Sequence, residues 1–347
     1  MSRYSIATRL GALFALSLLA VVSGCSKKGG SSLVAPMLPA SVSVNGYQAT
    51  STPGMVKFDV SAVMSNGSLI GSATITEPVL VGLATGPSTR GASPFGLTAA
   101  VTGTAGVCRS ISSLGPGVAS ICLDATGSMK ESDPDALRGK AARTYVSLMG
   151  PGDVAAVSSF DTHTPASPGL LAIRVYGGGF SSDSTMLKAC VDSASFAGGS
   201  TSLWDAAYDC AHVDSAQGGS NLLALVLTDG GDNASARTVV QAERYAHQQK
   251  MRVYMVGLNG LGALDDSTEA RLKWLAQETG GFYARADSAS QLSKLFANVF
   301  NASSASGCVS ATFRVNGVVP PPGTVIVGTM SFKVNGMPVT GPFRVVL

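Results

Sequence analysis

Hydrophobic and polar residues follow two different periods along the chain. In the middle, short apolar runs alternate with stretches whose apolar residues recur at helical spacing, which predicts strands alternating with helices. The predicted strands lie near Val118–Leu123, Asp153–Phe160, Leu170–Tyr176, Leu222–Thr228, Arg252–Leu258 and Gly281–Ala284. The predicted helices lie near Asp135–Met149, Asp183–Ser195, Leu203–Ala216, Ser235–Lys250, Thr268–Thr279 and Ala289–Phe300. This pattern is typical of an α/β fold with a doubly wound, mostly parallel sheet.

Both flanks of this middle segment have the strand period of two. Alternating apolar positions predict strands around Val42, Val56 and Ile70 before it, and around Phe313, Thr324 and Phe343 after it. Val-Asn-Gly recurs at positions 44, 315 and 334, and Asn-Gly favours hairpin turns. We predict one β-sandwich built from both flanks, with the α/β segment inserted in it. Two separate small β modules are the alternative, although such a short tail is marginal alone.

The first residues are typical of a targeting segment. Arg3 and Arg9 accompany an apolar run from Leu10 to Val22 that is short for a membrane span. The run ends in Val-Ser-Gly-Cys, which resembles a bacterial lipobox and implies cleavage before Cys25 and lipidation of its thiol. An ordinary signal peptide with a chance cysteine is the alternative. We expect a lipid-anchored protein of the bacterial cell envelope, at the outer rather than the inner membrane because Ser26 follows the cysteine.

The predicted organisation has five segments: a leader over 1–24, a flexible tether over 25–40, the first part of the sandwich over 41–115, the α/β domain over 116–302 and the second part of the sandwich over 303–347. Charged residues make up only 13% of the chain, and removal of the leader leaves 22 basic and 21 acidic residues. This near-neutral balance gives no reason to expect a nucleic-acid partner.

Oxygen-bearing side chains follow the buried strand Val118–Leu123. Asp124, Thr126 and Ser128 supply one carboxylate and two hydroxyls, with no thiol and no imidazole. In open α/β sheets, ligands sit at the carboxyl ends of strands, and these oxygens suit a hard cation such as Mg²⁺ or Mn²⁺. Read alone, the string also fits an N-cap for the next helix.

Two later stretches carry matching oxygens. Thr201 lies in a glycine-permitted turn after Gly198-Gly199, and Asp229 ends the apolar run Leu225–Thr228. Together the three pieces resemble the metal-ion-dependent adhesion site of the von Willebrand factor A family, whose pattern is D-x-S-x-S, then a lone Thr, then Asp in a T-D-G context. The resemblance covers about residues 116–302, and Thr126 stands where the family usually has Ser.

The resemblance implies one divalent cation, Mg²⁺ or alternatively Mn²⁺ or Ca²⁺. Thr126 and Ser128 would bind it directly, Thr201 directly in one state, and Asp124 and Asp229 mainly through water. An acidic side chain from a protein partner would complete the shell, so the implied function is adhesion or protein–protein interaction. A metal-free A domain is an alternative, as is an envelope scaffold or assembly factor that acts independently of metal. Loop acids Asp161, Asp205 and Asp232 are expected to be helix caps or solvated.

Enzyme chemistry is not expected. The histidines at 163, 212 and 247 lack metalloprotease spacing, and there is no G-x-S-x-G elbow or phosphate-binding loop.

The cysteines allow disulfides in an exported chain. Cys108 and Cys308 flank the presumed A domain, whose ends should meet at the base of its sheet, so this pair is the preferred disulfide. Cys190 and Cys210, on successive predicted helices, are a possible second. Cys122 is expected to pack as a small buried hydrophobe.

Overall fold

The structure, a computed structural model, describes residues 39–48, 52–64, 69–70, 75–86, 96–105, 115–194, 198–259, 264–304, 307–334 and 336–347. The predicted leader, Cys25, Cys108 and most of the tether lie outside these residues. Among the described residues, no helix is both long and apolar enough to span a bilayer.

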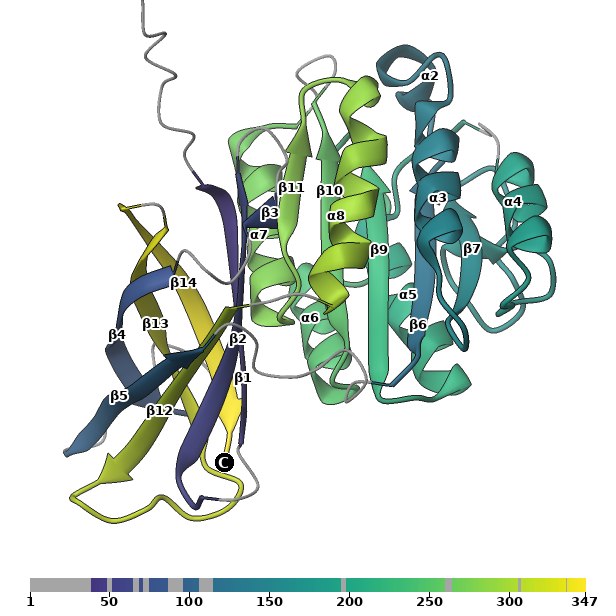
Figure 1. The fold of residues 1–347 in the computed structure, drawn as a ribbon. Helices are drawn as coiled ribbons and strands as arrows, with labels where there is room; N and C mark the ends of the chain where they lie inside the picture. The colour runs from purple at the N-terminus through teal and green to yellow at the C-terminus, as the bar shows by residue number, and fades with distance from the viewer. Residues whose placement is uncertain are drawn as a thin grey trace, which may run out of the picture. The chain divides into compact units, whose positions relative to one another are not determined.

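The middle of the chain forms a six-stranded sheet with the order β11-β10-β9-β6-β7-β8 (Figure 1). Its strands are β6 (Gly117–Asp124), β7 (Val154–Phe160), β8 (Ile173–Val175), β9 (Asn221–Thr228), β10 (Arg252–Leu258) and β11 (Tyr283–Ala286). All neighbours pair in parallel except β7 and β8. Every residue of β9 is buried, because helices cover both faces of the sheet.

Helices flank this sheet on two sides (Figure 1). They are α2 (Met129–Ser132), α3 (Leu137–Leu148), α4 (Ser184–Ser193), α5 (Leu203–Gln217), α6 (Val239–Gln248), α7 (Asp266–Glu278) and α8 (Leu292–Ser304). Side chains of α3, α4 and α8 share one buried cluster with one face of the sheet, and those of α5, α6 and α7 share a second with the other face. The predicted α/β fold class is confirmed, and α2 is an element that the sequence pattern did not indicate.

The starts of α8 and α6 are capped differently. A 3-10 turn, η2 (Ala289–Gln291), precedes α8, and Gln291 Oε1 accepts a hydrogen bond from the Asp287 N–H at 3.0 Å. Ser288 and Gln291 have the spacing of a capping box but do not form one, since the Ser288 hydroxyl pairs with that of Ser290. A complete capping box starts α6, where Thr238 and Gln241 exchange both hydrogen bonds.

The two flanks fold into one β-sandwich. Its strands are β1 (Pro39–Gln48), β2 (Met55–Met64), β3 (Leu69–Ile70), β4 (Ile75–Thr85), β5 (Leu97–Ala105), β12 (Gly307–Val315), β13 (Val325–Val334) and β14 (Met337–Val346). One sheet has the order β1-β2-β12-β5, with β3 beside β2, and the other has the order β14-β13-β4. β12 thus lies between two strands from the N-terminal flank, which excludes two separate modules. Phe58, Phe313 and Phe343 pack together in the core.

The Asn-Gly pairs play different roles. Asn316 and Gly317 have φ of 50° and 79° and form the turn after β12, and Gly336, φ 79°, lies in the β13–β14 hairpin. Asn45 and Gly46 instead lie inside β1, in register with Asp59 and Phe58 of β2. The third Asn-Gly pair is therefore part of a ladder and not a hairpin turn.

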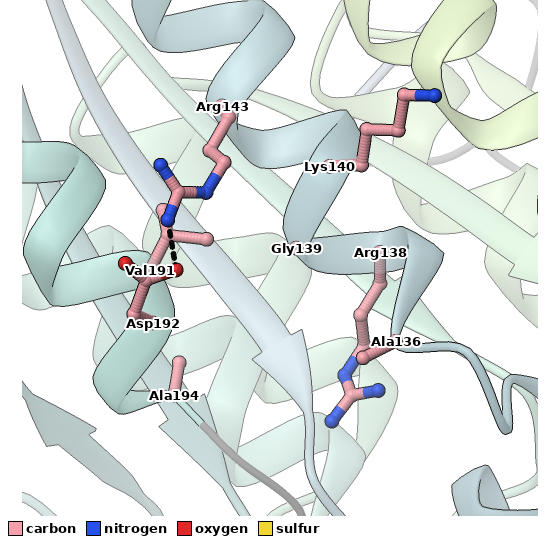
Figure 2. A pocket seen from close by; sticks show the side chains of 8 residues that line it. All are labelled: Ala136, Arg138, Gly139, Lys140, Arg143, Val191, Asp192 and Ala194. Atoms are coloured by element: carbon pink, nitrogen blue, oxygen red, sulfur yellow. Dashed lines mark hydrogen bonds and ion pairs between the residues drawn. The ribbon is translucent and has the colours of Figure 1, made fainter.

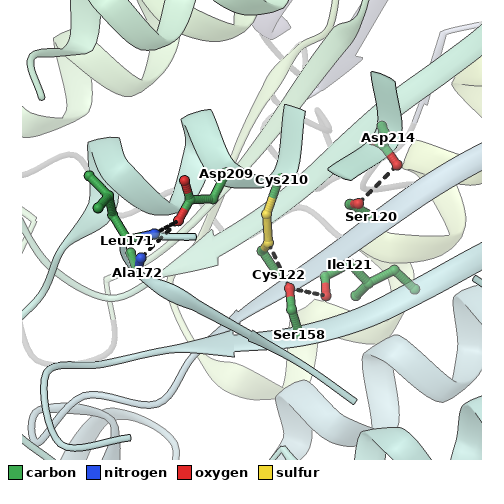
Figure 3. The surroundings of a disulfide bond; sticks show 9 residues. All are labelled: Ser120, Ile121, Cys122, Ser158, Leu171, Ala172, Asp209, Cys210 and Asp214. Atoms are coloured by element: carbon green, nitrogen blue, oxygen red, sulfur yellow. Dashed lines mark hydrogen bonds between the residues drawn. A yellow bond between two sulfur atoms is a disulfide. The ribbon is translucent and has the colours of Figure 1, made fainter. Parts of the chain in front are cut away.

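The disulfide pattern corrects two predictions. Cys122 on β6 is bonded to Cys210 on α5 (Figure 3). Cys190 has a free, buried thiol. The predicted Cys190–Cys210 pair is wrong because α4 and α5 cover opposite faces of the sheet. The prediction that Cys122 packs as an unbonded hydrophobe is wrong because its side chain points to the face that α5 covers. Cys308 is disulfide-bonded, and its predicted partner Cys108 lies outside the described residues.

Candidate functional site

The loop after β6 is organised by the buried carboxylate of Asp124. Its Oδ1 accepts hydrogen bonds from the Thr126 N–H at 2.9 Å and the Thr126 hydroxyl at 2.6 Å. Its Oδ2 accepts from the Thr228 hydroxyl at 2.8 Å, and Thr228 is the last residue of β9. Because β6 and β9 are parallel neighbours, their carboxyl ends meet at one edge of the sheet.

The second carboxylate, Asp229, follows β9 directly and is also fully buried. Its Oδ1 accepts from the exposed Ser128 hydroxyl at 2.8 Å, and its Oδ2 accepts from the Ser132 hydroxyl on α2. The Ser128 and Thr126 hydroxyl oxygens lie 3.3 Å apart. Four of the five predicted site residues thus belong to one hydrogen-bonded group.

The fifth predicted site residue, Thr201, lies in a loop that is bonded to the other two. The Gly198 N–H donates to the Ala125 carbonyl at 3.0 Å, and the Gly127 N–H donates to the Gly199 carbonyl at 3.2 Å. The Thr201 N–H donates to Asn233 Oδ1 at 2.8 Å, and the Thr201 carbonyl accepts from the Asn233 N–H at 3.0 Å. Backbone hydrogen bonds therefore draw the three loops together, with Thr201 buried between its neighbours.

The electrostatics of the group favour a positive ligand. Burial, and then the charge of Asp229, raise the pKa of Asp124 from 3.8 to about 6. The charge of Arg138 also acts on both carboxylates, but this buried guanidinium is paired with Asp133 at 3.1 Å. A cation between the carboxylates would offset the cost of keeping two buried negative charges close together.

The hydroxyl groups have a geometry suited to a hard cation. A hydroxyl that donates its proton to a carboxylate keeps its oxygen lone pairs free, and both Thr126 and Ser128 donate in this way. The described residues contain no group of three or more His, Cys, Asp or Glu side chains placed to hold a metal ion. The carboxylates of Asp124 and Asp229 and the hydroxyls of Thr126 and Ser128 are oxygen donors of the kind that Mg²⁺ prefers, and Mg²⁺ also retains water.

Of the three neighbouring acids, only Asp232 bonds to a helix start as expected, whereas Asp161 and Asp205 are buried rather than solvated, and Asp205 lies within α5. Asp161 accepts from the His163 N–H at 2.6 Å, and Asp232 accepts from the Leu203 N–H at 2.9 Å at the start of α5. Asp205 accepts from the Ala236 N–H at 2.7 Å and is paired with Arg237. These acids therefore fix loops around the group.

Three residues of the group had no role in the sequence prediction: Ser132, Thr228 and Asn233. Ser132 lies one helical turn after Ser128, a spacing that becomes a signal only once α2 is known to be helical. Thr228 lies inside the recognised T-D-G string.

A cavity of about 220 Å³ lies between α3 and α4 (Figure 2). It is lined by Ala136, Arg138, Gly139, Lys140, Arg143, Val191, Asp192 and Ala194. Arg143 and Asp192 form an ion pair across the two helices. None of the predicted site residues lines this cavity, so the hydrogen-bonded group is a separate feature.

Comparisons with known proteins gave matches only among solved structures. No protein-family model and no curated protein matches the sequence. Similar solved structures include a von Willebrand factor type A protein from Catenulispora acidiphila, with 13% identity over 89% of this chain and 74% of that chain and a TM-score of 0.46. The ArnB paralog VWA2 from Sulfolobus acidocaldarius has 14% identity over 88% and 74%, with a TM-score of 0.41.

A third similar structure is the vWF domain of the type V pili tip protein Mfa5 from Porphyromonas gingivalis, with 13% identity over 54% of this chain and 95% of that chain and a TM-score of 0.40. The α/β architecture of this chain rests on its own features. These are the mostly parallel six-stranded sheet, the helices on both faces and the loops at the carboxyl ends of β6 and β9.

Proposed function

We propose that this protein binds a protein partner at the cell surface through a divalent cation held by Asp124, Thr126, Ser128, Thr201 and Asp229. Mg²⁺ is the preferred ion, with Mn²⁺ or Ca²⁺ as alternatives. The observation that carries the proposal is that two buried carboxylates accept hydrogen bonds from hydroxyls whose lone pairs remain available.

Each side chain has a distinct task in this proposal. Asp124 and Asp229 are held by hydrogen bonds and supply negative charge without reaching the surface. Thr126, Ser128 and Thr201 supply neutral oxygens. A bound Mg²⁺ surrounded mostly by neutral oxygens and water keeps enough charge to attract a carboxylate from a partner. Ser128 is exposed, so this side of the group is open to a partner's acidic side chain.

The proposed location is the bacterial cell envelope, through a lipid on Cys25 that anchors the chain to the outer membrane. The lipobox-like string supports this location. Mass spectrometry of the membrane-extracted protein would detect the acyl groups on a peptide beginning at Cys25. A peptide beginning elsewhere and carrying no lipid would contradict the anchor. Binding, not catalysis, is the proposed activity, because the sequence carries no metalloprotease histidine spacing, no G-x-S-x-G elbow and no phosphate-binding loop.

The test is isothermal titration of the full chain with Mg²⁺ and Mn²⁺. We expect the Ser128→Ala variant to bind at least about tenfold more weakly than the wild type. Ser147→Ala is the matched control, because Ser147 is an exposed hydroxyl on α3 that bonds to the Arg143 carbonyl, away from the group. Absence of divalent binding by the wild type would overturn the proposal.

A metal-independent scaffold or assembly factor remains the rival function, and chelation separates the two. Partners captured by the wild-type protein should be released by EDTA and should not be captured by Ser128→Ala. Partners that persist in EDTA would instead identify the scaffold function.

A further inference from the structure

Helix α5 connects to all three loops of the candidate site. It begins at Leu203, two residues after Thr201, and its Cys210 is bonded to Cys122, two residues before Asp124 (Figure 3). A covalent bond therefore joins the two elements that carry the first and second loops. Both sulfur-bearing side chains are fully buried between α5 and the sheet.

Polar contacts fix the same helix along its length. At its start, the Leu203 N–H donates to Asp232 and the Trp204 N–H donates to Ser235 at 3.0 Å, which ties α5 to the loop after β9. Further along, Asp214 accepts from the Ser120 hydroxyl of β6 at 2.8 Å (Figure 3).

Another carboxylate of α5 holds the loop before β8. Asp209 Oδ2 accepts from the N–H groups of Leu171 and Ala172, each at 2.7 Å (Figure 3). Arg237, from the loop after β9, lies between Asp209 and Asp205 at 3.6 and 3.1 Å. Among these contacts of α5, the disulfide is covalent. Its Cys122 is also nearer to Asp124 in the chain than Ser120, the other β6 residue bonded to α5.

The loop that carries Thr201 contains two glycines, so its backbone can adopt many conformations. Gly198 and Gly199 have φ of 96° and 87°, a region that glycine adopts without steric cost and in which it keeps much backbone freedom. Beyond its hydrogen bonds to Asn233, the position of Thr201 therefore depends on the helix that follows it. Mg²⁺ demands near-ideal octahedral geometry, so a shift of about 0.5 Å in a ligand loop matters for binding.

We propose that the Cys122–Cys210 disulfide is a positioning device that holds Thr201 in register with Asp124. This inference rests on the proposed function, because it concerns the ligand geometry of the same site. The bond keeps α5 from moving along β6, and the loop between residues 198 and 202 moves with α5.

The test compares the Cys122→Ala/Cys210→Ala double variant with Cys190→Ala in the full chain. Cys190 is the matched control, because it is buried on the opposite face of the sheet and has no bond to lose. Hydrogen exchange of the metal-free proteins and Mn²⁺ titration are the two readouts. We expect faster amide exchange at residues 198–202 and about tenfold weaker Mn²⁺ binding in the double variant, with neither change in Cys190→Ala.

Loss of stability alone is distinguished by a further control. Leu187→Ala removes buried volume on α4, away from α5, and should lower the melting temperature without raising exchange at residues 198–202. If the double variant does not fold, Cys122→Val/Cys210→Ala takes its place, because valine restores part of the lost volume. The inference would be overturned if a folded variant without the disulfide exchanged its amides at residues 198–202 at the wild-type rate. Absence of Mn²⁺ binding by the wild type would refute the proposed function, and the exchange data would still decide the positioning role.

Discussion

At the scale of single residues, the charged side chains of the candidate site are buried and a neutral hydroxyl is exposed. Asp124 and Asp229 are completely buried, whereas Ser128, which donates to Asp229, is exposed. Thr126, where the related motif usually has Ser, keeps the essential hydroxyl and donates it to Asp124. The extra methyl group therefore leaves the hydrogen-bond pattern of the loop intact.

The raised pKa of Asp124 makes proposed cation binding depend on pH. A proton and a cation compete for this carboxylate, and its pKa is raised to about 6 by burial and by Asp229. We expect Mg²⁺ affinity to be constant above this pH and to fall by up to about tenfold per unit below it. Titration calorimetry between about pH 5 and 8 measures the Mg²⁺ affinity on both sides of this pKa. An affinity that stays flat across this range would contradict the role of Asp124.

Asp214 should make folding stability fall as pH rises. Burial raises its pKa well above the ordinary value of 3.8, and its Oδ2 has no hydrogen-bond partner among the described residues. Its contribution to stability is therefore present below pH 3.8 and is lost as pH rises through the raised pKa. Asp214→Asn keeps an acceptor for Ser120 and carries no charge, so its advantage over the wild type should grow with pH. Urea unfolding at several pH values tests this, and parallel stability curves would contradict it.

At the scale of elements, close backbone approaches matter more than propensity. Gly281 connects α7 to β11, and its N–H donates to the Ala276 carbonyl at 2.9 Å. A Cβ built on Gly281 would lie 2.0 Å from the Val253 carbonyl oxygen. The sequence placed this glycine only at the start of a predicted strand, because the close approach comes from β10, which is distant in the chain.

Gly281→Ala should therefore destabilise the α/β domain by about 1–3 kcal/mol, the usual cost of overpacking. Gly103→Ala is the control, because Gly103 in β5 has ordinary φ and nothing within 4 Å of its added Cβ. Its effect should stay within about 0.5 kcal/mol. Urea denaturation monitored by tryptophan fluorescence provides the comparison, and equal midpoints for the two variants would refute the steric explanation.

At the scale of the whole molecule, the sandwich depends on both ends of the chain. β12 pairs with β2 and β5, and β13 pairs with β4, so strands from the C-terminal flank fill the middle of both sheets. Because an isolated group of edge strands has no buried face, the N-terminal flank needs the C-terminal strands to fold.

A chain that ends at residue 304 should therefore lose amide protection in β2, β4 and β5. Protection in the strands of the α/β sheet provides the internal reference, since none of them pairs with β12, β13 or β14. Hydrogen exchange with mass spectrometry resolves the two sets of strands. Protection of β2 and β5 that persists in the shortened chain would show that the N-terminal flank folds by itself.

The sequence alone determined most elements of the α/β domain, because hydrophobic period distinguishes buried strands from helices. Only the resemblance of the three motifs implied that Asp124 and Asp229 lie together, because period does not say that β6 and β9 are neighbours. Tertiary structure alone decided which helix covers which face of the sheet. For this reason Cys210 is bonded to Cys122 and not to Cys190. Side-chain alternation in β6 shows that Cys122 and Ile121 face opposite ways, but it does not say which helix each one meets. That choice depends on packing between segments far apart in the chain, which local patterns do not encode.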